Sequence, residues 1–284
     1  MLHLLSPAKI NLFLRVLDKR SDGYHEVASL MQAIDLSDRL AFRLSDKDTL
    51  ICNAPHFPLD EKNLILKAAN LFRKKTGKKF GLHVEVEKRI PMEAGLGGGS
   101  SNAATTLWAL NQLHQFPVMT EELQTWSSEL GSDVPFFFSK GTAYCTGRGE
   151  RVLEVEPLTS FLFWVVKPEF GLSTAEVYKR YQPYQSEMWQ PERILESFKA
   201  GNPKYFNDLE TPAFSCMPTL QTFKASLMEQ GFSQVLMSGS GSSFFCFCEE
   251  FSKLRVEEVV TKLPFETKFY PVKYINRKHS GWYL

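Results

Sequence analysis

A glycine-rich segment, Pro91–Asn102, constrains this chain more than any other stretch of its sequence. It reads PMEAGLGGGSSN, with four glycines among the five residues 95–99. Glycine reaches positive φ at little steric cost, so the backbone of such a loop can approach a ligand closely. Apolar residues then recur at helical spacing from Ala103 to Leu113. A loop that runs into a helix start points several N–H groups one way and adds the positive end of the helix dipole, so the segment predicts an anion site.

This loop differs from the common nucleotide-binding motifs. A P-loop needs a lysine before its Ser or Thr, and residues 91–102 contain none. The dinucleotide fingerprint fails because Ser100 stands where its third glycine should be. The chain also lacks the G-x-S-x-G elbow and the H-R-D and D-F-G motifs of protein kinases. We therefore expect a phosphate cradle of another class, in which Ser100 or Ser101 can bind a phosphate oxygen or Mg²⁺; the alternative is a flexible turn capped by serine.

A second glycine-rich loop, Met237–Ser243, lies between two apolar, strand-like runs. Taken alone it is weak evidence, because glycine and serine are common in hairpin turns. The presence of another cradle in the same chain favours a functional role for both loops.

Two charged residues stand out by their context. Lys9 lies in the alternating segment Ala8–Leu17, where Lys9 and Asn11 share one face of a predicted strand. Asp133 directly precedes Val134-Pro135 and a run of three phenylalanines. A carboxylate beside such a run is expected to be partly buried and to need a cation or donors. The alternatives are a solvated strand face for Lys9 and a turn or helix-capping role for Asp133.

None of the six histidines has the spacing of a metal site, and His25 is the one that suggests function. Gly23–Glu26 places Tyr24, an imidazole and a carboxylate together after Arg20-Ser21-Asp22. The alternative is an ordinary surface turn.

The predicted elements are mixed. Residues 63–76 have a helical pattern, and the helix after the glycine-rich loop places Ala103, Leu107, Leu110 and Leu113 on one face. Pro135–Val155 has the pattern of strands, and Ser173 with Glu176 predicts a capping box for a helix over 174–181. Strands and helices do not alternate regularly, which favours an α+β fold in two lobes. We place the boundary at Pro157, giving domains 1–157 and 158–284.

Composition limits the function and the compartment. The chain has 284 residues, with 33 basic and 32 acidic side chains, and this balance argues against nucleic-acid binding. Its first residues, MLHLLSPAKI, lack the basic region of a signal peptide, and Phe161–Val166 is far shorter than the ~20 residues that span a bilayer. The five cysteines form no disulfide framework. We expect a soluble, cytoplasmic protein that binds no membrane and is a monomer or weak homodimer.

Three ordered motifs resemble the GHMP kinase superfamily of galactose, homoserine, mevalonate and phosphomevalonate kinases. They are the Pro-x-Lys-x-Asn strand at residues 7–11, the Pro-x3-Gly-Leu-Gly-Gly-Gly-Ser-Ser loop at 91–101 and the Ser-Gly-Ser-Gly-Ser loop at 238–242. Gly23–Glu26 and Gly131–Phe137 resemble the members of the family that act on a cytidine-bearing alcohol. The resemblance covers essentially the whole chain. It implies an N-terminal lobe like ribosomal protein S5 domain 2, a ferredoxin-like C-terminal lobe, and an active site between them.

The resemblance implies an ATP-dependent kinase with Mg²⁺. Asp133 matches the catalytic base, and Lys9 matches the lysine that keeps Asp133 ionised and offsets charge on the transferred phosphoryl group. The implied ATP contacts are Asn63, expected at the adenine, and the loop residues Pro91, Met92, Glu93, Ala94, Gly95, Leu96, Gly97, Gly98, Gly99, Ser100 and Ser101.

The implied acceptor is the 2-hydroxyl of 4-diphosphocytidyl-2-C-methyl-D-erythritol, an isoprenoid precursor of the non-mevalonate pathway. Its implied contacts are Asn11 at the erythritol end, Tyr24, His25 and Tyr178 around the cytosine, and Gly239, Ser240 and Gly241. The alternatives are a homoserine or mevalonate type of kinase, a non-catalytic ATP-binding sensor, and an RNA-binding module.

Two positions depart from the family pattern. Glu93 replaces a small residue of the ATP loop, where a carboxylate would repel phosphate unless it points to solvent. Met31 stands where an aromatic side chain is expected near the substrate.

Overall fold

Two sheets organise the molecule, and a long hairpin of the first packs against the second. The computed structural model describes residues 1–183, 190–248, 251, 255–277 and 281–283. The strands are β1 (Leu2–Lys19), β2 (His25–Ser45), β3 (Thr49–Cys52), β4 (Gly81–Glu87), β5 (Thr142–Gly147), β6 (Arg151–Glu154), β7 (Leu162–Pro168), β8 (Phe206–Asn207), β9 (Gln234–Met237), β10 (Phe244–Phe247) and β11 (Thr267–Lys273). The helices are α1 (Leu64–Thr76), α2 (Gly98–Leu113), α3 (Thr120–Ser127), α4 (Thr174–Arg180), α5 (Pro191–Lys199), α6 (Glu210–Cys216), α7 (Thr219–Glu229) and α8 (Val256–Val260), with the 3₁₀ helix η1 (Pro135–Phe138).

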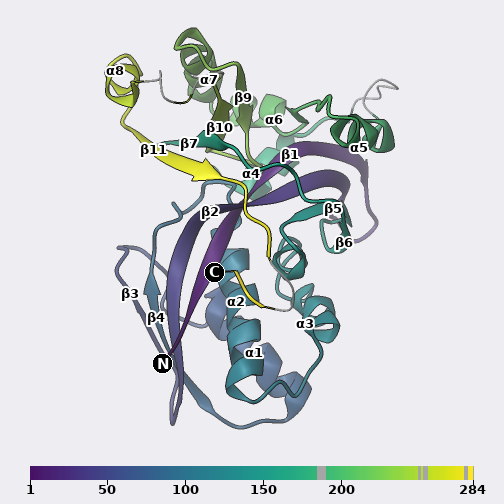
Figure 1. Ribbon diagram of the computed structural model, residues 1–284, viewed down its shortest axis with the longest axis vertical. Coiled ribbons are helices and arrows are strands. Elements are labelled where there is room, and N and C mark those ends of the chain that lie inside the picture. The colour runs from purple at the N-terminus through teal and green to yellow at the C-terminus, as the bar shows by residue number, and fades with distance from the viewer. Residues whose placement is uncertain (184–189, 249–250, 252–254, 278–280, 284) are drawn as a thin grey trace.

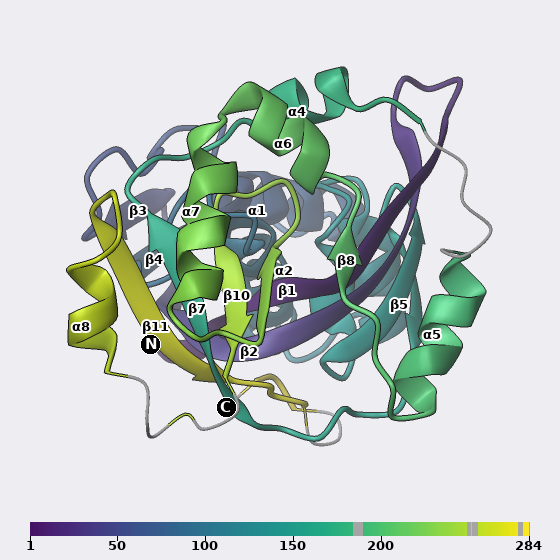
Figure 2. The same cartoon turned by 90° about the horizontal axis from the view of Figure 1, so that it is seen from above.

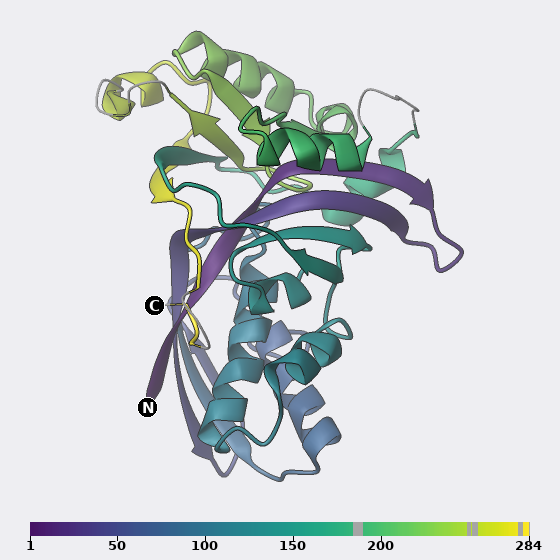
Figure 3. The same ribbon diagram turned by 45° about the vertical axis from the view of Figure 1, so that its right-hand side comes forward.

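Strands β1 and β2 pair antiparallel and run from the lower part of the molecule to beneath the second sheet (Figures 1 and 3). The first sheet has the order β3-β4-β2-β1-β8, and β5 also pairs with β2 and with β6. The predicted alternation at residues 8–17 is therefore part of a longer strand. Ile10 and Leu12 enter the core beneath the second sheet, so the opposite face of β1 carries Lys9 and Asn11.

Helix α2 packs against the first sheet and α1, with α3 and η1 on its flank (Figure 1). The sequence pattern predicted one apolar face, but every residue from Ser101 to Asn111 is buried. The polar side chains Thr105 and Thr106 are buried at little cost because each donates to the carbonyl four residues earlier, at 2.9 and 2.7 Å. A helix start held this firmly is a rigid support for the loop before it.

The second sheet has the order β11-β7-β10-β9 and buries both of its faces. Phe163 and Phe245 face the hairpin, whereas Val166 and Phe244 face α4, α6 and α7. Seen from above, α7 lies across the outer face of this sheet (Figure 2). Double burial explains why β7 and β10 are almost continuously apolar.

Parts of the second half of the chain return to the first sheet. Strand β8 pairs in parallel with β1, and Trp282 stacks on Trp108 of α2 with ring centroids 5.3 Å apart. Arg277 donates to the carbonyl oxygens of Phe138 and Ser139. The two hydrogen bonds from Arg277 fix the segment that follows Asp133.

Two local predictions were wrong. The phenylalanine run forms η1 rather than a strand, since Pro135 begins a tight turn whose three rings are all buried. Ser173 is the N-cap of α4, but its side chain makes no capping hydrogen bond. Within the part of the chain that the structure describes, no helix is long and apolar enough to cross a membrane.

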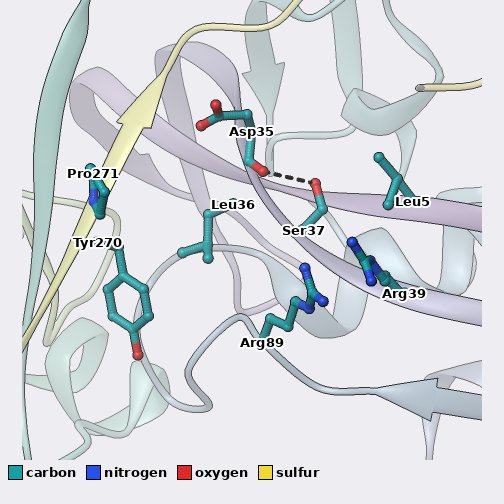
Figure 4. Close-up of a pocket in the computed structure, with 8 residues that line it drawn as sticks. All are labelled: Leu5, Asp35, Leu36, Ser37, Arg39, Arg89, Tyr270 and Pro271. Carbon is teal, nitrogen blue, oxygen red and sulfur yellow. Dashed lines mark hydrogen bonds between the residues drawn. The ribbon is translucent and has the colours of Figure 1, made fainter.

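A cavity of about 380 Å³ lies where the hairpin, β11 and the segment after β4 meet (Figure 4). It is lined by Leu5, Asp35, Leu36, Ser37, Arg39, Arg89, Tyr270 and Pro271. None of the predicted site residues lines it.

Candidate active site

Lys9 lies where the predicted motifs meet. Its side chain is 4% exposed, and Nζ lies 3.4 Å from Asp133 Oδ2 and donates to Asn11 Oδ1 at 2.6 Å. Asp133 is 32% exposed, so this carboxylate has one side against the ammonium and one side open. The solvated alternative for Lys9 is therefore wrong. The pair combines a fixed cation with an accessible acceptor for a proton.

Asn11 is oriented by a short chain of hydrogen bonds. Its Nδ2 donates to Ser29 Oγ at 2.8 Å, and Ser29 Oγ donates to the Phe13 carbonyl oxygen at 2.6 Å. These hydrogen bonds direct the amide nitrogen of Asn11 toward β2, so that its amide oxygen is left to accept from Lys9. The side chains of Lys9, Asn11 and Ser29 are nearly inaccessible to water, and this packing keeps the Lys9 ammonium in one place.

The first glycine-rich loop has the backbone geometry of an anion cradle. Gly95 and Gly97 adopt φ of 73° and 68°, and Gly97 is the N-cap of α2, with no side chain capping the first turn. The Lys9 backbone N–H donates to the Leu96 carbonyl oxygen at 2.9 Å. A Cβ at Gly97 would lie only 3.0 Å from Lys9 Cγ. The loop thus brings uncapped N–H groups at a helix start next to a buried ammonium.

A second lysine supports this loop, and sequence analysis missed it. Lys88 Nζ lies 3.0 Å from the Asp38 carboxylate, whose Oδ1 also accepts the backbone N–H groups of Arg89 and Ile90 at 2.8 Å. Burial lowers the pKa of Lys88, and the charge of Asp38 opposes that shift. A Cβ at Gly98 would lie 3.3 Å from Lys88 Nζ, so this ammonium adjoins the helix start. The only sequence signal was a Lys-Arg pair directly before the loop.

The second glycine-rich loop packs on the first. Ser238 Oγ donates to the Gly95 carbonyl oxygen at 3.0 Å, and the Ser243 N–H donates to that of Ala94 at 3.2 Å. At Gly239, a Cβ would lie 3.3 Å from both Lys9 Nζ and Asn11 Oδ1. The two loops and β1 therefore surround one small volume. The neighbouring Ser240 Oγ is 2.7 Å from Thr174 Oγ1.

Aromatic side chains gather beside Asp133. His25 stacks on Tyr178 at 5.3 Å between ring centroids and meets Tyr181 edge-on at 5.9 Å. Burial raises the pKa of Tyr178, and the negative charge of Asp133 adds to the shift. Burial lowers the pKa of His25, with Lys19 contributing, so its imidazole is neutral at pH 7 and offers one donor and one acceptor.

Tyr24 is placed differently from the other two rings. It is 53% exposed, and the Arg148 guanidinium lies 4.8 Å above its ring centroid. Arg148 belongs to the turn between β5 and β6, whose Gly149 adjoins Asp133: a Cβ there would be 3.4 Å from Oδ1. The turn thus contacts the Tyr24 ring through Arg148 and adjoins Asp133 through Gly149.

Comparison with known proteins identifies the family. The GHMP kinases N terminal domain family matches residues 63–141, and the GHMP kinases C terminal family matches residues 194–266. The 4-diphosphocytidyl-2-C-methyl-D-erythritol kinase of Protochlamydia amoebophila (strain UWE25) is 51% identical over 283 residues, which cover 99% of this chain and 93% of that protein. The chain belongs to the 4-diphosphocytidyl-2-C-methyl-D-erythritol kinases of the GHMP family.

Solved structures agree with this assignment. The crystal structure of a 4-(cytidine 5'-diphospho)-2C-methyl-D-erythritol kinase matches with a TM-score of 0.79 and 35% identity, covering 96% of this chain and 99% of that one. A homoserine kinase from Cytophaga hutchinsonii matches with a TM-score of 0.72 at 16% identity, over 97% and 95% of the two chains, and shares the fold. The predicted two-lobe α+β fold and the resemblance to GHMP kinases are confirmed. The chain is an ATP-dependent small-molecule kinase.

The structure also places the unusual Glu93 of this GHMP kinase. Glu93 adopts φ of 50°, and its carboxylate lies against Gly171, leaving no room for a side chain there. Nearby Lys167 donates to the carbonyl oxygens of Pro168 and Phe170 at 2.8 and 2.7 Å. Burial lowers the pKa of Lys167 to about 8, and the charge of Glu93 opposes that shift. Glu93 thus faces a cation of the second lobe.

The remaining predicted positions of the kinase differ in how their side chains are used. Asn63 is the N-cap of α1, with Oδ1 accepting the Ile65 N–H at 2.9 Å. Ser101 is fully buried and its hydroxyl bonds that of Ser6 at 2.8 Å, whereas Ser100 is partly exposed. Met31 is 3% exposed and packs in the core of the first lobe. Among the described residues, no three His, Cys, Asp or Glu side chains gather as a metal site.

Proposed function

We propose that this kinase transfers the γ-phosphoryl group of ATP to the 2-hydroxyl of 4-diphosphocytidyl-2-C-methyl-D-erythritol. The observation that carries the proposal is the Lys9–Asp133 pair, 3.4 Å apart, at the point where both glycine-rich loops and β1 meet. The relatives named above supply the identity of the acceptor.

The proposed transfer uses Asp133 as the base. The 2-hydroxyl oxygen attacks the γ-phosphorus, the bond from that phosphorus to the bridging oxygen breaks, and ADP leaves with the bond's electrons. The hydroxyl proton goes to the open carboxylate oxygen of Asp133. The hydroxyl is tertiary and hindered, so positioning by Asn11 and by the loops contributes much of the rate. Lys9 offsets negative charge on the phosphoryl oxygens while the phosphoryl group moves toward the acceptor.

We propose that the loop Pro91–Ser101 holds the phosphates of ATP. Support comes from the uncapped start of α2 and from the ammonium groups of Lys9 and Lys88 beside it. Mg²⁺ would neutralise phosphate charge when bound with ATP, and the partly exposed Ser100 is the better placed of the two serines to contact it. Asn63 lies next to the loop, since Leu64 adjoins Gly99, which supports a contact with the nucleotide.

We propose that the cytosine binds among Tyr24, His25 and Tyr178. The neutral His25 can accept from the exocyclic amine and donate to a ring acceptor, while the aromatic rings offer faces for stacking. Arg148, which lies over Tyr24, suits the diphosphate because its planar guanidinium can bind two phosphate oxygens at once. Gly239, Ser240 and Gly241 would contact the part of the substrate nearest to Lys9.

The alternatives fit less well. A homoserine or mevalonate kinase has no use for the His25–Tyr178 stack, and the homoserine kinase match shares only the fold. A non-catalytic sensor has no need of a buried lysine beside an accessible carboxylate. The balanced charge disfavours an RNA-binding module.

The position of the new phosphate tests the proposal. The acceptor carbon carries a methyl group and no hydrogen, so its phosphate should give a ³¹P signal without coupling to a carbinol proton. We expect this signal only with ATP, Mg²⁺ and active protein, and its absence from an Asp133→Asn control over the same time. A proton-coupled phosphomonoester signal would mean that another hydroxyl is the acceptor.

We also propose that the enzyme acts in the cytoplasm as a monomer or weak homodimer. The five cysteines are all free, which is consistent with a reducing compartment. We propose domains 1–157 and 158–284; the boundary separates the two sheets except for β8 and the C-terminal residues that pack on α2.

A further inference from the structure

One buried side chain holds the second glycine-rich loop from behind. Asn207, at the end of β8, is 6% exposed. Its Nδ2 donates to the carbonyl oxygens of Met237 and Gly239 at 2.8 and 2.7 Å. Its Oδ1 accepts the Leu209 N–H at 2.9 Å. The amide group is therefore fully used, and two of its three bonds go to the loop.

The residues next to Asn207 fix it in place. The Asp208 carboxylate accepts the Val16 N–H at 2.9 Å and pairs with Arg15 at 3.0 Å, both on β1. Glu210 Oε1 accepts the Met237 N–H at 3.0 Å. The segment is thus tied to β1 on one side and to β9 on the other. These are the strands that carry Lys9 and lead into the loop, so the segment that carries Asn207 links them at the site.

The carbonyl group that Asn207 holds is close to the reacting groups. Gly239 adopts φ of 56°, and its Cα faces Lys9 Nζ and Asn11 Oδ1. A carbonyl oxygen in this loop carries partial negative charge. If it turned toward the phosphates, it would oppose the transfer and compete for Lys9. The bond from Asn207 holds that oxygen in one direction.

We propose that Asn207 is a positioning residue for phosphoryl transfer. It orients the Gly239 peptide so that the loop presents no carbonyl oxygen to the transferred group and stays in contact with Lys9. It touches neither substrate itself. The inference rests on the proposed function, because the assay uses that reaction.

The test compares Asn207→Ala, Asn207→Asp and Asn207→Ser with Asn202→Ala, an exposed position just before β8 in the chain. Aspartate has the same shape and keeps the acceptor for Leu209, but when ionised it has no donor for the two carbonyls. We expect kcat to fall roughly 10- to 100-fold in the alanine and aspartate variants, as for a small misplacement of reacting groups. Serine should lose less, since it retains one donor.

Binding of a non-hydrolysable ATP analogue should stay within about threefold of wild type, because the ATP loop is intact. Asn202→Ala should match wild type in every measurement. The proposal is overturned if kcat is unchanged in a folded Asn207→Ala protein, if the loss lies wholly in ATP affinity, or if none of the Asn207 variants folds. An inactive wild-type enzyme would instead contradict the proposed function.

Discussion

Removing either charge of the Lys9–Asp133 pair should stop phosphoryl transfer, but the two changes should affect stability differently. Lys9 is 4% exposed and Asp133 is 32% exposed. Asp133→Asn leaves a buried ammonium that faces neutral amide oxygens, that of Asn11 and that of the new side chain, and no longer an anion. Lys9→Met removes the buried charge and leaves a carboxylate that water can reach. We therefore expect the aspartate variant to be the less stable of the two.

The distance sets the size of the effect. At 3.4 Å and an effective dielectric constant of about 20, the attraction is about 5 kcal/mol. Desolvation of the ammonium costs several kcal/mol and offsets most of this. Losing the anion should then cost about 1–3 kcal/mol, less than for a fully buried pair because Asp133 is partly solvated. Lys9→Met should stay within about 1 kcal/mol of wild type, since it loses one hydrogen bond but no longer buries a charge.

Urea unfolding followed by circular dichroism measures these changes, and ADP release measures turnover. Asp133→Asn should lose roughly 10²–10⁴-fold in kcat, as expected for a general base. Lys9→Met should lose roughly 10²–10³-fold, as expected for loss of one charge-stabilising group. The reasoning is refuted if Lys9→Met is destabilised as much as Asp133→Asn, or if either variant keeps near-normal turnover.

Three further predictions concern the pockets around this pair. Tyr24→Ala should raise KM for the cytidine substrate roughly 5- to 150-fold with little change in kcat, since stacking contributes about 1–3 kcal/mol; an unchanged KM would argue against stacking. Gly95→Ala places a Cβ against the Ser238 carbonyl oxygen, so calorimetry should show at least roughly tenfold weaker ATP binding; wild-type affinity would mean that the loops can separate freely. Lys167 titrates at about 8 against its usual 10.5, so the unfolded chain holds more protons in this window and the contribution of Lys167 to stability should rise with pH from 8 to 10.5. NMR titration of the lysines should show a still lower pKa in Glu93→Gln, and an unchanged value would remove Glu93 as its partner.

The sequence was most informative where local chemistry is distinctive. The glycine density at residues 95–99 predicted an anion site, and the structure has an uncapped helix start there. The phenylalanines after Asp133 predicted that its carboxylate is partly buried. The alternation around Lys9 placed it on one strand face with Asn11 but did not decide whether that face is buried. Resemblance to the family, rather than spacing, brought the two residues together, because 124 positions separate them in the chain.

What the sequence could not predict depends on contacts between distant segments. Lys88 directly precedes the loop in the sequence, but only its ion pair with the distant Asp38 shows that it is held beside the helix start. Arg148 lies in the turn between β5 and β6, and only the fold brings it over Tyr24, far away in the sequence. Asn207 belongs to a two-residue strand, too short for any period to show. The sequence of helix α2 predicts an amphipathic helix because polar threonines interrupt its apolar residues. In the structure these threonines are buried, since each hydroxyl donates to a carbonyl oxygen of its own helix.

The most direct test of the central claim is ADP release by the purified protein with ATP, Mg²⁺ and a series of acceptors. The acceptors are 4-diphosphocytidyl-2-C-methyl-D-erythritol, mevalonate, homoserine and none. We predict turnover with the cytidine-bearing alcohol alone, because its base engages His25 and its 2-hydroxyl reaches Asp133. Turnover with mevalonate or homoserine would contradict the account. So would the absence of ADP release with every acceptor, in protein that still binds ATP.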